Sequence, residues 1–282
     1  MLKTFHQGGI HPPENKLSAD SPVRELPLAK VVYIPVGQHL GAPSVPVVKK
    51  GDKVRTGQLI ATGSGFVSAN IHSSVSGTVV KVEPFADTFG YPRMGIAIET
   101  NGDEWVNAID RSPEVKKEFN LTGPEIVQKI LEAGIVGMGG ATFPTHVKLV
   151  PPKGMKIELL LINGVECEPF LTSDNRLMVE KPDEIVTGTR ILMKALNVDK
   201  AFIGIENNKP DAIRILKEAV KDYPGLAVVP LKVKYPQGGE KQLIKAITGR
   251  EVPSGGLPVD VGVVAFNVGT VFAGYEAVPK NT

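Results

Sequence analysis

The chain has 282 residues, of which 42% are hydrophobic and 22% charged, a balance typical of one large or two ordinary globular domains. Its net charge of +2 is spread without long blocks of one sign, which argues against nucleic-acid binding through a basic face. The single cysteine, Cys167, excludes an internal disulfide and a cysteine-ligated iron–sulfur centre within these residues. Five scattered histidines and apolar stretches shorter than about 20 residues predict neither a metal site nor a membrane-spanning helix.

The first third of the chain predicts an all-β unit of roughly 70 residues. Turn residues separate its short β-branched runs, which lie at residues 31–36, 59–61, 78–82 and 95–98. Residues 48–60 and 71–79 resemble biotinyl/lipoyl carrier domains, which hold a modified lysine in the turn between these segments. No lysine lies between Lys53 and Lys81, so a structural barrel-sandwich is favoured over a carrier.

The rest of the chain alternates strand and helix patterns. A capping box at Thr122 and Glu125 predicts a helix that ends at Gly134. Further strands are expected at residues 157–162, 201–205, 226–233 and 261–266, and helices at 183–196, 210–223 and 240–247. This alternation predicts an α/β domain with a mainly parallel, Rossmann-like sheet. We place the β domain in residues 1–115 and the α/β domain in residues 116–282.

A glycine-rich loop at residues 134–148 is the densest signal of ligand binding. Glycines at 137, 139 and 140 leave the backbone bare for a planar or anionic ligand, and Lys148 would add a charge-assisted bond. The loop is neither a Walker loop nor a Rossmann fingerprint. A tight connection between two helices is the alternative.

A polar cluster follows the strand expected at residues 157–162. It contains Asn163, Glu166 and Glu168, and ligands of open α/β sheets gather beyond the carboxyl ends of the strands. Taken alone, these residues favour an acidic loop that caps the next helix. We expect Cys167, within the same cluster, to pack as a small apolar residue.

Four segments in order resemble the NADH-binding flavoprotein subunit of respiratory complex I. They are residues 137–148, 163–174, 235–243 and 266–270. Together with the opening at residues 5–13 and the barrel-sandwich, they resemble more closely the C subunits of Rnf electron-transport complexes. This resemblance covers nearly the whole chain.

The resemblance implies a module that binds FMN non-covalently and accepts hydride from NADH. Flavin contacts carry over to Gly137, Gly139, Gly140, Lys148, Asn163, Glu166, Gly238 and Asn267. NADH contacts carry over to Phe143, Glu168 and Glu240. No residue is expected to act as a strong acid or base, because the flavin supplies the redox chemistry.

The chain departs from these relatives at two points. Val165 stands where the flavoprotein of complex I has an acid, and the cysteine motifs that hold two [4Fe–4S] clusters in the Rnf family are missing before Thr282. We therefore expect an amino-terminal fragment without its own outlet for single electrons. The family further implies other subunits as partners and a peripheral place on the cytoplasmic side of the membrane. A non-catalytic docking module is the alternative function.

Overall fold

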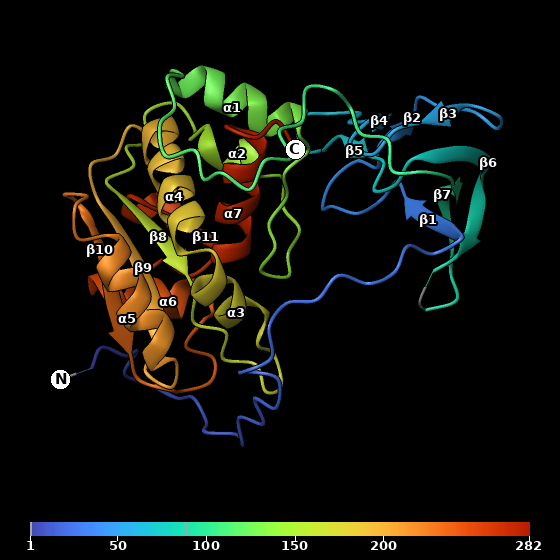
Figure 1. Ribbon diagram of the computed structural model, residues 1–282. Coiled ribbons are helices and arrows are strands. Elements are labelled where there is room, and N and C mark those ends of the chain that lie inside the picture. The colour runs from blue at the N-terminus through green and yellow to red at the C-terminus, as the bar shows by residue number, and fades with distance from the viewer. Residues whose placement is uncertain (1, 88) are drawn as a thin grey trace. The chain divides into compact units, whose positions relative to one another are not determined.

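The computed structural model describes residues 2–87 and 89–282, which form two compact units (Figure 1). The sheet unit comprises the residues up to 23 with residues 115–126 and 148–275. The β unit comprises residues 24–114, 127–147 and 276–282. The chain thus passes between the units several times, whereas the sequence predicted one division after residue 115.

Four parallel strands form the centre of the sheet unit. They are β8 (Leu159–Asn163), β9 (Ala201–Glu206), β10 (Leu226–Leu231) and β11 (Val263–Asn267), in the order β10-β9-β8-β11. Nearly continuous runs of Leu, Ile and Val make such strands, because helices bury a parallel sheet on both faces. The predicted α/β class with a mainly parallel sheet is confirmed.

Helices of the sheet unit lie on both sides of this sheet (Figure 1). They are α3 (Ser173–Glu180), α4 (Pro182–Leu196), α5 (Pro210–Ala219), α6 (Glu240–Thr248), the short 3₁₀ helix η1 (Pro258–Val261) and α7 (Val268–Ala277). Two further helices, α1 (Gly123–Glu132) and α2 (Thr145–Leu149), fall mostly within the β unit. Helix α6 covers one face, where Leu243 and Ile247 join a core with Leu161. Helices α4 and α7 touch closely, because a Cβ on Gly188 would lie 2.4 Å from the carbonyl oxygen of Val271.

The helix predictions are confirmed in part. The capping box forms, since the Thr122 N–H donates to Glu125 Oε2 at 2.7 Å, and Gly134 beyond the helix end has a φ of +68°. Helix α5 ends four residues earlier than predicted, at Ala219. The sequence missed α3 and α7, because α3 is polar and α7 is apolar around most of its circumference.

The β unit is built from two antiparallel sheets. One contains β1 (Val31–Pro35), β7 (Pro92–Thr100), β6 (Gly77–Ala86) and β3 (Lys53–Val54) in that order, and the other contains β2 (Val45–Pro46), β4 (Leu59–Thr62) and β5 (Ile71–His72). Their shared core is aliphatic, with Ile60, Ile96 and Ile98 fully buried. The all-β prediction is confirmed, although β6 and β7 form a longer hairpin than expected.

An N-terminal strap, residues 2–23, runs along the sheet unit with little regular structure of its own. Lys3 bridges Leu231 at the end of β10, and Ile10 bridges Tyr235. The ammonium of Lys3 also donates to the carbonyl of Ile247 at 2.7 Å. In the described part of the chain, no helix has the length and apolar character needed to cross a membrane.

Candidate functional site

Two asparagines end neighbouring strands at the carboxyl edge of the parallel sheet. Asn163 of β8 and Asn267 of β11 are paired in register. Each uses Oδ1 to accept the N–H two residues ahead, from Val165 at 3.1 Å and from Gly269 at 2.8 Å. Each therefore stabilises the turn that leaves its strand.

The amide nitrogens of the same asparagines reach other segments. Asn163 Nδ2 donates to the carbonyl of Gly238 at 2.8 Å, and Asn267 Nδ2 donates to Asp174 Oδ2 at 2.7 Å. Three of the four motifs on which the resemblance depends thus meet at one edge of the sheet. Because parallel strands all end at this edge, it is the usual ligand site of such folds.

Glu166 caps helix α3 from outside. Its Oε1 accepts the N–H of Asp174 at 2.7 Å, and its Oε2 accepts the N–H of Asn175 at 3.2 Å. A carboxylate is favourable here, because the helix N-terminus carries partial positive charge and free N–H groups. The acidic loop caps the helix that follows it, as one interpretation expected, but that helix is α3, which the sequence did not predict, and not the helix expected at residues 183–196. The flavin contact expected of Glu166 stays a prediction.

Asp174 is a half-buried carboxyl beside this cap. Burial, and then the nearby charge of Glu166, raise the pKa of Asp174 to about 6, although the hydrogen bond from Asn267 opposes the shift. The sequence marked Asp174 only as part of a family motif, since nothing local distinguishes it from a surface aspartate.

Lys148 and Glu240 form an ion pair in the sheet unit. Lys148 Nζ lies 2.8 Å from Glu240 Oε1 and donates to the carbonyl of Ala265 at 2.8 Å. It also lies 5.3 Å from the centre of the Phe266 ring. The residue expected to balance a phosphate and one expected near the nicotinamide are therefore neighbours beside β11.

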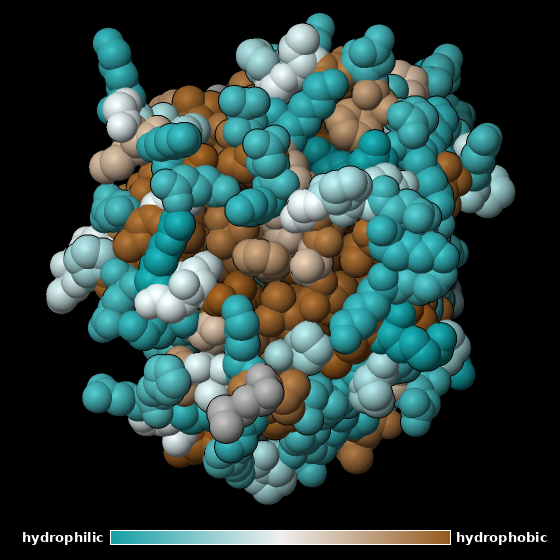
Figure 2. Space-filling view, turned by 90° about the vertical axis from the view of Figure 1, so that its left-hand side faces the viewer, coloured by the Kyte–Doolittle hydropathy of each residue, from teal (hydrophilic) through white to brown (hydrophobic). Residues whose placement is uncertain are grey.

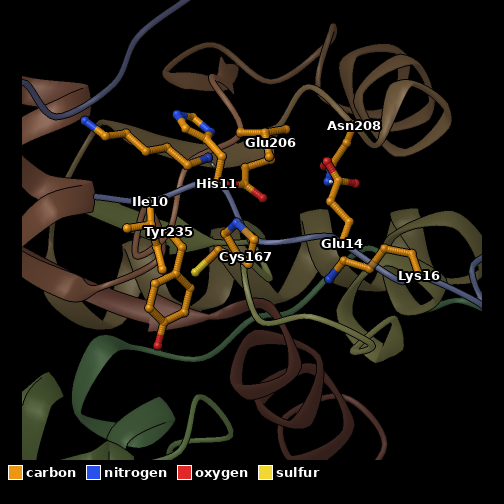
Figure 3. A pocket seen from close by; sticks show the side chains of 11 residues that line it. Ile10, His11, Glu14, Lys16, Cys167, Glu206, Asn208 and Tyr235 are labelled. Carbon is orange, nitrogen blue, oxygen red and sulfur yellow. Dashed lines mark hydrogen bonds between the residues drawn. The ribbon is translucent and has the colours of Figure 1, made fainter. Parts of the chain in front are cut away.

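Tyr235 lines a cavity of about 250 Å³ beside the acidic loop (Figure 3). The Tyr235 hydroxyl donates to Glu168 Oε1 at 3.0 Å, and this bond with the carboxylate charge raises the pKa of Tyr235. Cys167 lines the cavity and packs against the core below it. Burial raises the pKa of the Cys167 thiol, in keeping with its expected role as a small packed residue.

The glycine-rich loop belongs to the β unit up to residue 147. The N–H of Gly137 donates to the carbonyl of Phe143 at 2.9 Å, so that the loop closes on itself. Gly139 and Gly140 at its tip are exposed, and Gly140 has a φ of +112° with no atom within 4 Å of an added Cβ. The loop therefore presents bare backbone, as its glycines predict.

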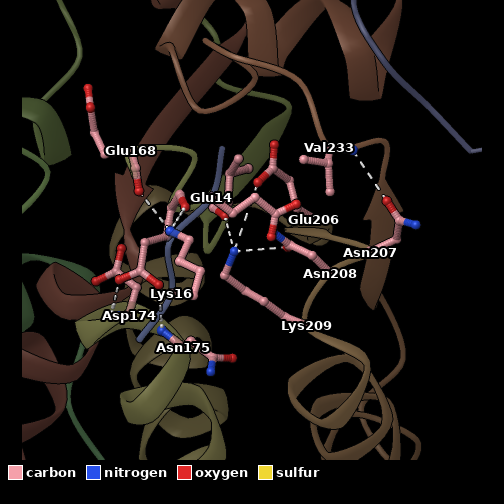
Figure 4. A network of polar contacts seen from close by, with 12 residues as sticks. Glu14, Lys16, Glu168, Asp174, Asn175, Glu206, Asn207, Asn208, Lys209 and Val233 are labelled. Carbon is pink, nitrogen blue, oxygen red and sulfur yellow. Dashed lines mark hydrogen bonds and ion pairs between the residues drawn. The ribbon is translucent and has the colours of Figure 1, made fainter. Parts of the chain in front are cut away.

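Lys209 and Glu206 form a buried ion pair next to the acidic loop, and the sequence did not predict it (Figure 4). Lys209 Nζ donates to the carbonyl of Val165 at 2.8 Å and lies 3.9 Å from Glu206 Oε2. The Glu206 carboxylate also accepts the N–H of Lys234 at 3.0 Å. Burial raises the pKa of Glu206 and lowers the pKa of Lys209. The one local signal is an acid at the end of a buried strand.

In the described residues, no group of three His, Cys, Asp or Glu side chains is arranged to hold a metal ion.

Comparison with known proteins finds a matching family model for most of each unit. Residues 130–276 match the family model of the Nuo51 FMN-binding domain, so most of the sheet unit belongs to that class of flavin-binding domain. Residues 3–103 match the model of the RnfC barrel sandwich hybrid domain. The chain belongs to the family of Rnf complex C subunits, which is related to the flavoprotein subunit of complex I. The resemblance found in the sequence is confirmed.

Two relatives illustrate the match, and both are C subunits of ferredoxin:NAD(+) oxidoreductase complexes. The chain is 52% identical over 282 residues to that of the proton-translocating complex of Clostridium ljungdahlii, covering 99% of this chain and 61% of that protein. It is 48% identical over 268 residues to that of the Na(+)-translocating complex of Acetobacterium woodii, covering 94% of this chain and 59% of that protein. The chain thus spans about three-fifths of the length of these curated relatives.

Proposed function

We propose that this chain is the FMN- and NADH-binding module of an ion-translocating electron-transport complex. The observation that carries the proposal is the convergence of Asn163, Gly238 and Asn267 at one edge of the parallel sheet. These residues are remote in sequence, yet each lies in a segment for which the family resemblance implies flavin contact. The match to a Nuo51 FMN-binding domain supports the same cofactor.

The polar groups at this edge suit FMN. Amide side chains provide hydrogen bonds for the polar edge of an isoalloxazine, and the Lys148 ammonium provides a positive charge for a phosphate. Strand β8 lies between β9 and β11 in the sheet. The chain therefore continues from β8 to β9 and β10 on one side, and later returns to β11 on the other side. We propose that this Rossmann-like switch point is where the cofactor binds.

When bound, FMN supplies two-electron chemistry with a nicotinamide and one-electron chemistry with iron–sulfur clusters. This chain's own residues would bind the cofactor and the nucleotide and fix their orientation. Asn163 and Asn267 are already oriented by the turns that they stabilise, which lowers the entropy lost on binding. Glu168, steadied by Tyr235, would accept hydrogen bonds from ribose hydroxyls of NADH, and Phe143 would offer a stacking face.

The remaining parts of the assignment follow from the family. We propose that electrons leave through [4Fe–4S] clusters held outside these 282 residues. Other subunits of the complex would be the partners, at the cytoplasmic side of the membrane. The names of the relatives, which describe ferredoxin:NAD(+) oxidoreductase complexes, support NADH as the nicotinamide substrate.

Flavin binding tests the proposal directly. FMN fluorescence should be quenched on titration with the protein, and NADH should bleach the bound flavin under anaerobic conditions. Absence of binding at tens of micromolar, in the chain extended to include its cluster region, would count against the proposal.

A matched pair of glycine variants tests the glycine-rich loop. Gly137→Ala places its Cβ no closer than 3.6 Å to a backbone atom, and Gly37→Ala meets nothing within 4 Å. Both variants should fold like the wild type. If the flavin ring passes over bare backbone at residue 137, Gly137→Ala should weaken FMN binding by about tenfold or more, whereas Gly37→Ala should leave it unchanged.

A docking module of the same kind of complex is the second candidate. It is favoured by a continuous area of apolar side chains on the face drawn in Figure 2, rimmed by hydrophilic residues. The carrier-like β unit without a lysine between Lys53 and Lys81 also suits docking. A Gly139→Val variant separates the candidates, because the flavin proposal predicts lost activity with assembly retained, and pure docking predicts that both are retained.

A further inference from the structure

The N-terminal strap carries a lysine whose ammonium meets three carbonyl oxygens of the acidic loop. Lys16 Nζ donates to the carbonyl of Glu168 at 2.7 Å (Figure 4). It also donates to the carbonyl of Glu166 at 2.8 Å and to that of Leu171 at 2.6 Å. An ammonium has three N–H donors and no acceptor, so these bonds use its whole capacity. One side chain from outside the loop thus joins three points along it.

The loop has a backbone that needs such support. Glu166 and Phe170 have φ values of +50° and +68°, a left-handed conformation that costs a side-chain-bearing residue free energy. Three carbonyl dipoles that converge on one point also repel one another unless a cation lies between them. The positive charge of Lys16 therefore offsets both the cost of the left-handed backbone and the repulsion between the carbonyl dipoles.

Other parts of the strap bind the same loop. The N–H of Phe170 donates to the carbonyl of Glu14 at 3.0 Å, and the hydroxyls of Ser18 and Thr172 are hydrogen-bonded at 2.7 Å. Residues 14–18 therefore follow the loop along its length, with Lys16 at the middle of the contact.

We propose that Lys16 is a positioning residue of the nucleotide site, a built-in cation that holds residues 166–171 in the shape that presents Glu168. Lys16 acts through the backbone of the loop, not by touching the reacting atoms. This inference rests on the proposed function, because the shape of the loop matters for activity only if Glu168 meets a nucleotide.

The test compares two lysines of the strap by hydrogen exchange in the protein without FMN. Lys16→Met keeps most of the side-chain length and removes the charge. Lys3→Met is the matched control, because Lys3 also donates to a carbonyl, that of Ile247, away from the loop. We expect backbone amides in residues 164–172 to exchange at least tenfold faster in Lys16→Met and at the wild-type rate in Lys3→Met.

Chemical rescue distinguishes a cation site from simple packing. In a Lys16→Gly variant, millimolar methylammonium should restore protection of residues 164–172, whereas sodium chloride at equal ionic strength should not. FMN and NADH affinities should then fall several-fold in Lys16→Met and recover in Lys16→Gly with methylammonium.

The outcomes separate this inference from the proposed function. Unchanged exchange of the loop in Lys16→Met, or equal effects of Lys16→Met and Lys3→Met, would overturn the role of Lys16. If the loop exchanges faster only in the Lys16 variants but the protein binds neither FMN nor NADH, then Lys16 does hold the loop in shape, and the proposed nucleotide site is wrong.

Discussion

The two units bury similar aliphatic cores but place their polar side chains differently. In the sheet unit, polar side chains at the carboxyl edge bond to one another across long sequence distances, as Asn267 does with Asp174. In the β unit, buried serine hydroxyls donate to backbone carbonyls, as Ser44 does to the carbonyl of Ala69 and Ser73 to that of Val75. Parallel strands end together at one edge, whereas antiparallel hairpins alternate their ends, so only the first arrangement concentrates functional groups.

This contrast predicts that polar substitutions are more damaging in the sheet unit than in the β unit. Lys209→Met should have the largest effect, because it leaves the Glu206 carboxylate, with a side chain 1% exposed, buried without its cation. We expect a loss of about 3–5 kcal/mol in the free energy of unfolding, measured by urea denaturation. Lys217→Met on the exposed face of α5 is the control and should change stability by less than about 0.5 kcal/mol. Equal midpoints for the two variants would contradict the idea.

In the β unit, backbone fit should matter more than polar contacts. A Cβ on Gly134 would lie 2.1 Å from the carbonyl oxygen of Asn70 at a φ of +68°, so Gly134→Ala should cost about 2–4 kcal/mol. Gly140→Ala meets no atom and should cost only about 1 kcal/mol through its backbone conformation. Thermal unfolding of both variants measures the difference, and similar melting temperatures would show that the loop has rearranged.

The pH dependence of stability sharpens the comparison at the sheet edge. Because its pKa is raised to about 6, folded Asp174 binds its proton more tightly than the unfolded chain does. Its contribution to stability therefore falls as the pH rises from about 4 through 6. Relative to wild type, Asp174→Asn should be neutral near pH 4 and gain about 3 kcal/mol above pH 7. Urea unfolding of both proteins between pH 4 and pH 7 measures this difference in stability. A difference that does not change with pH would refute the prediction.

The smallest expected effect concerns the carrier-like pattern of the β unit. Co-expression with biotin or lipoyl ligases should leave the intact mass of the chain unchanged, since residues 62–70 between β4 and β5 contain no lysine. An added biotinyl or lipoyl mass would restore the carrier hypothesis.

Local patterns predicted much of the fold. The runs of β-branched and aliphatic residues located all four strands of the parallel sheet. In the structure, α4 and α6 end at Asn197 and Gly249, which have the left-handed conformation typical of helix ends. Helices without a one-sided apolar face escaped prediction, because periodicity is the signal on which such predictions depend.

The candidate site could be predicted only as separate segments. The family motifs named Asn163, Glu166, Gly238 and Asn267 as site residues, but did not show which of these groups bond to one another. Lys209 and Lys16 reach Val165 and Glu166 from 44 and 150 residues away in the chain. No local pattern marks either lysine, because a surface lysine and a buried one look alike in sequence.

By itself, the sequence determined the α/β class and the all-β unit, because propensity, periodicity and turn chemistry act over a few neighbouring residues. The carrier-like pattern without its lysine and the segments of the candidate flavin site came from resemblance to known families. The tertiary structure alone decided which groups meet. The cap of α3 by Glu166, the pairing of Lys148 with Glu240 and the grip of Lys16 on the acidic loop depend on where the folded chain returns. Those contacts form only once burial of the apolar strands has brought remote segments to one edge of the sheet.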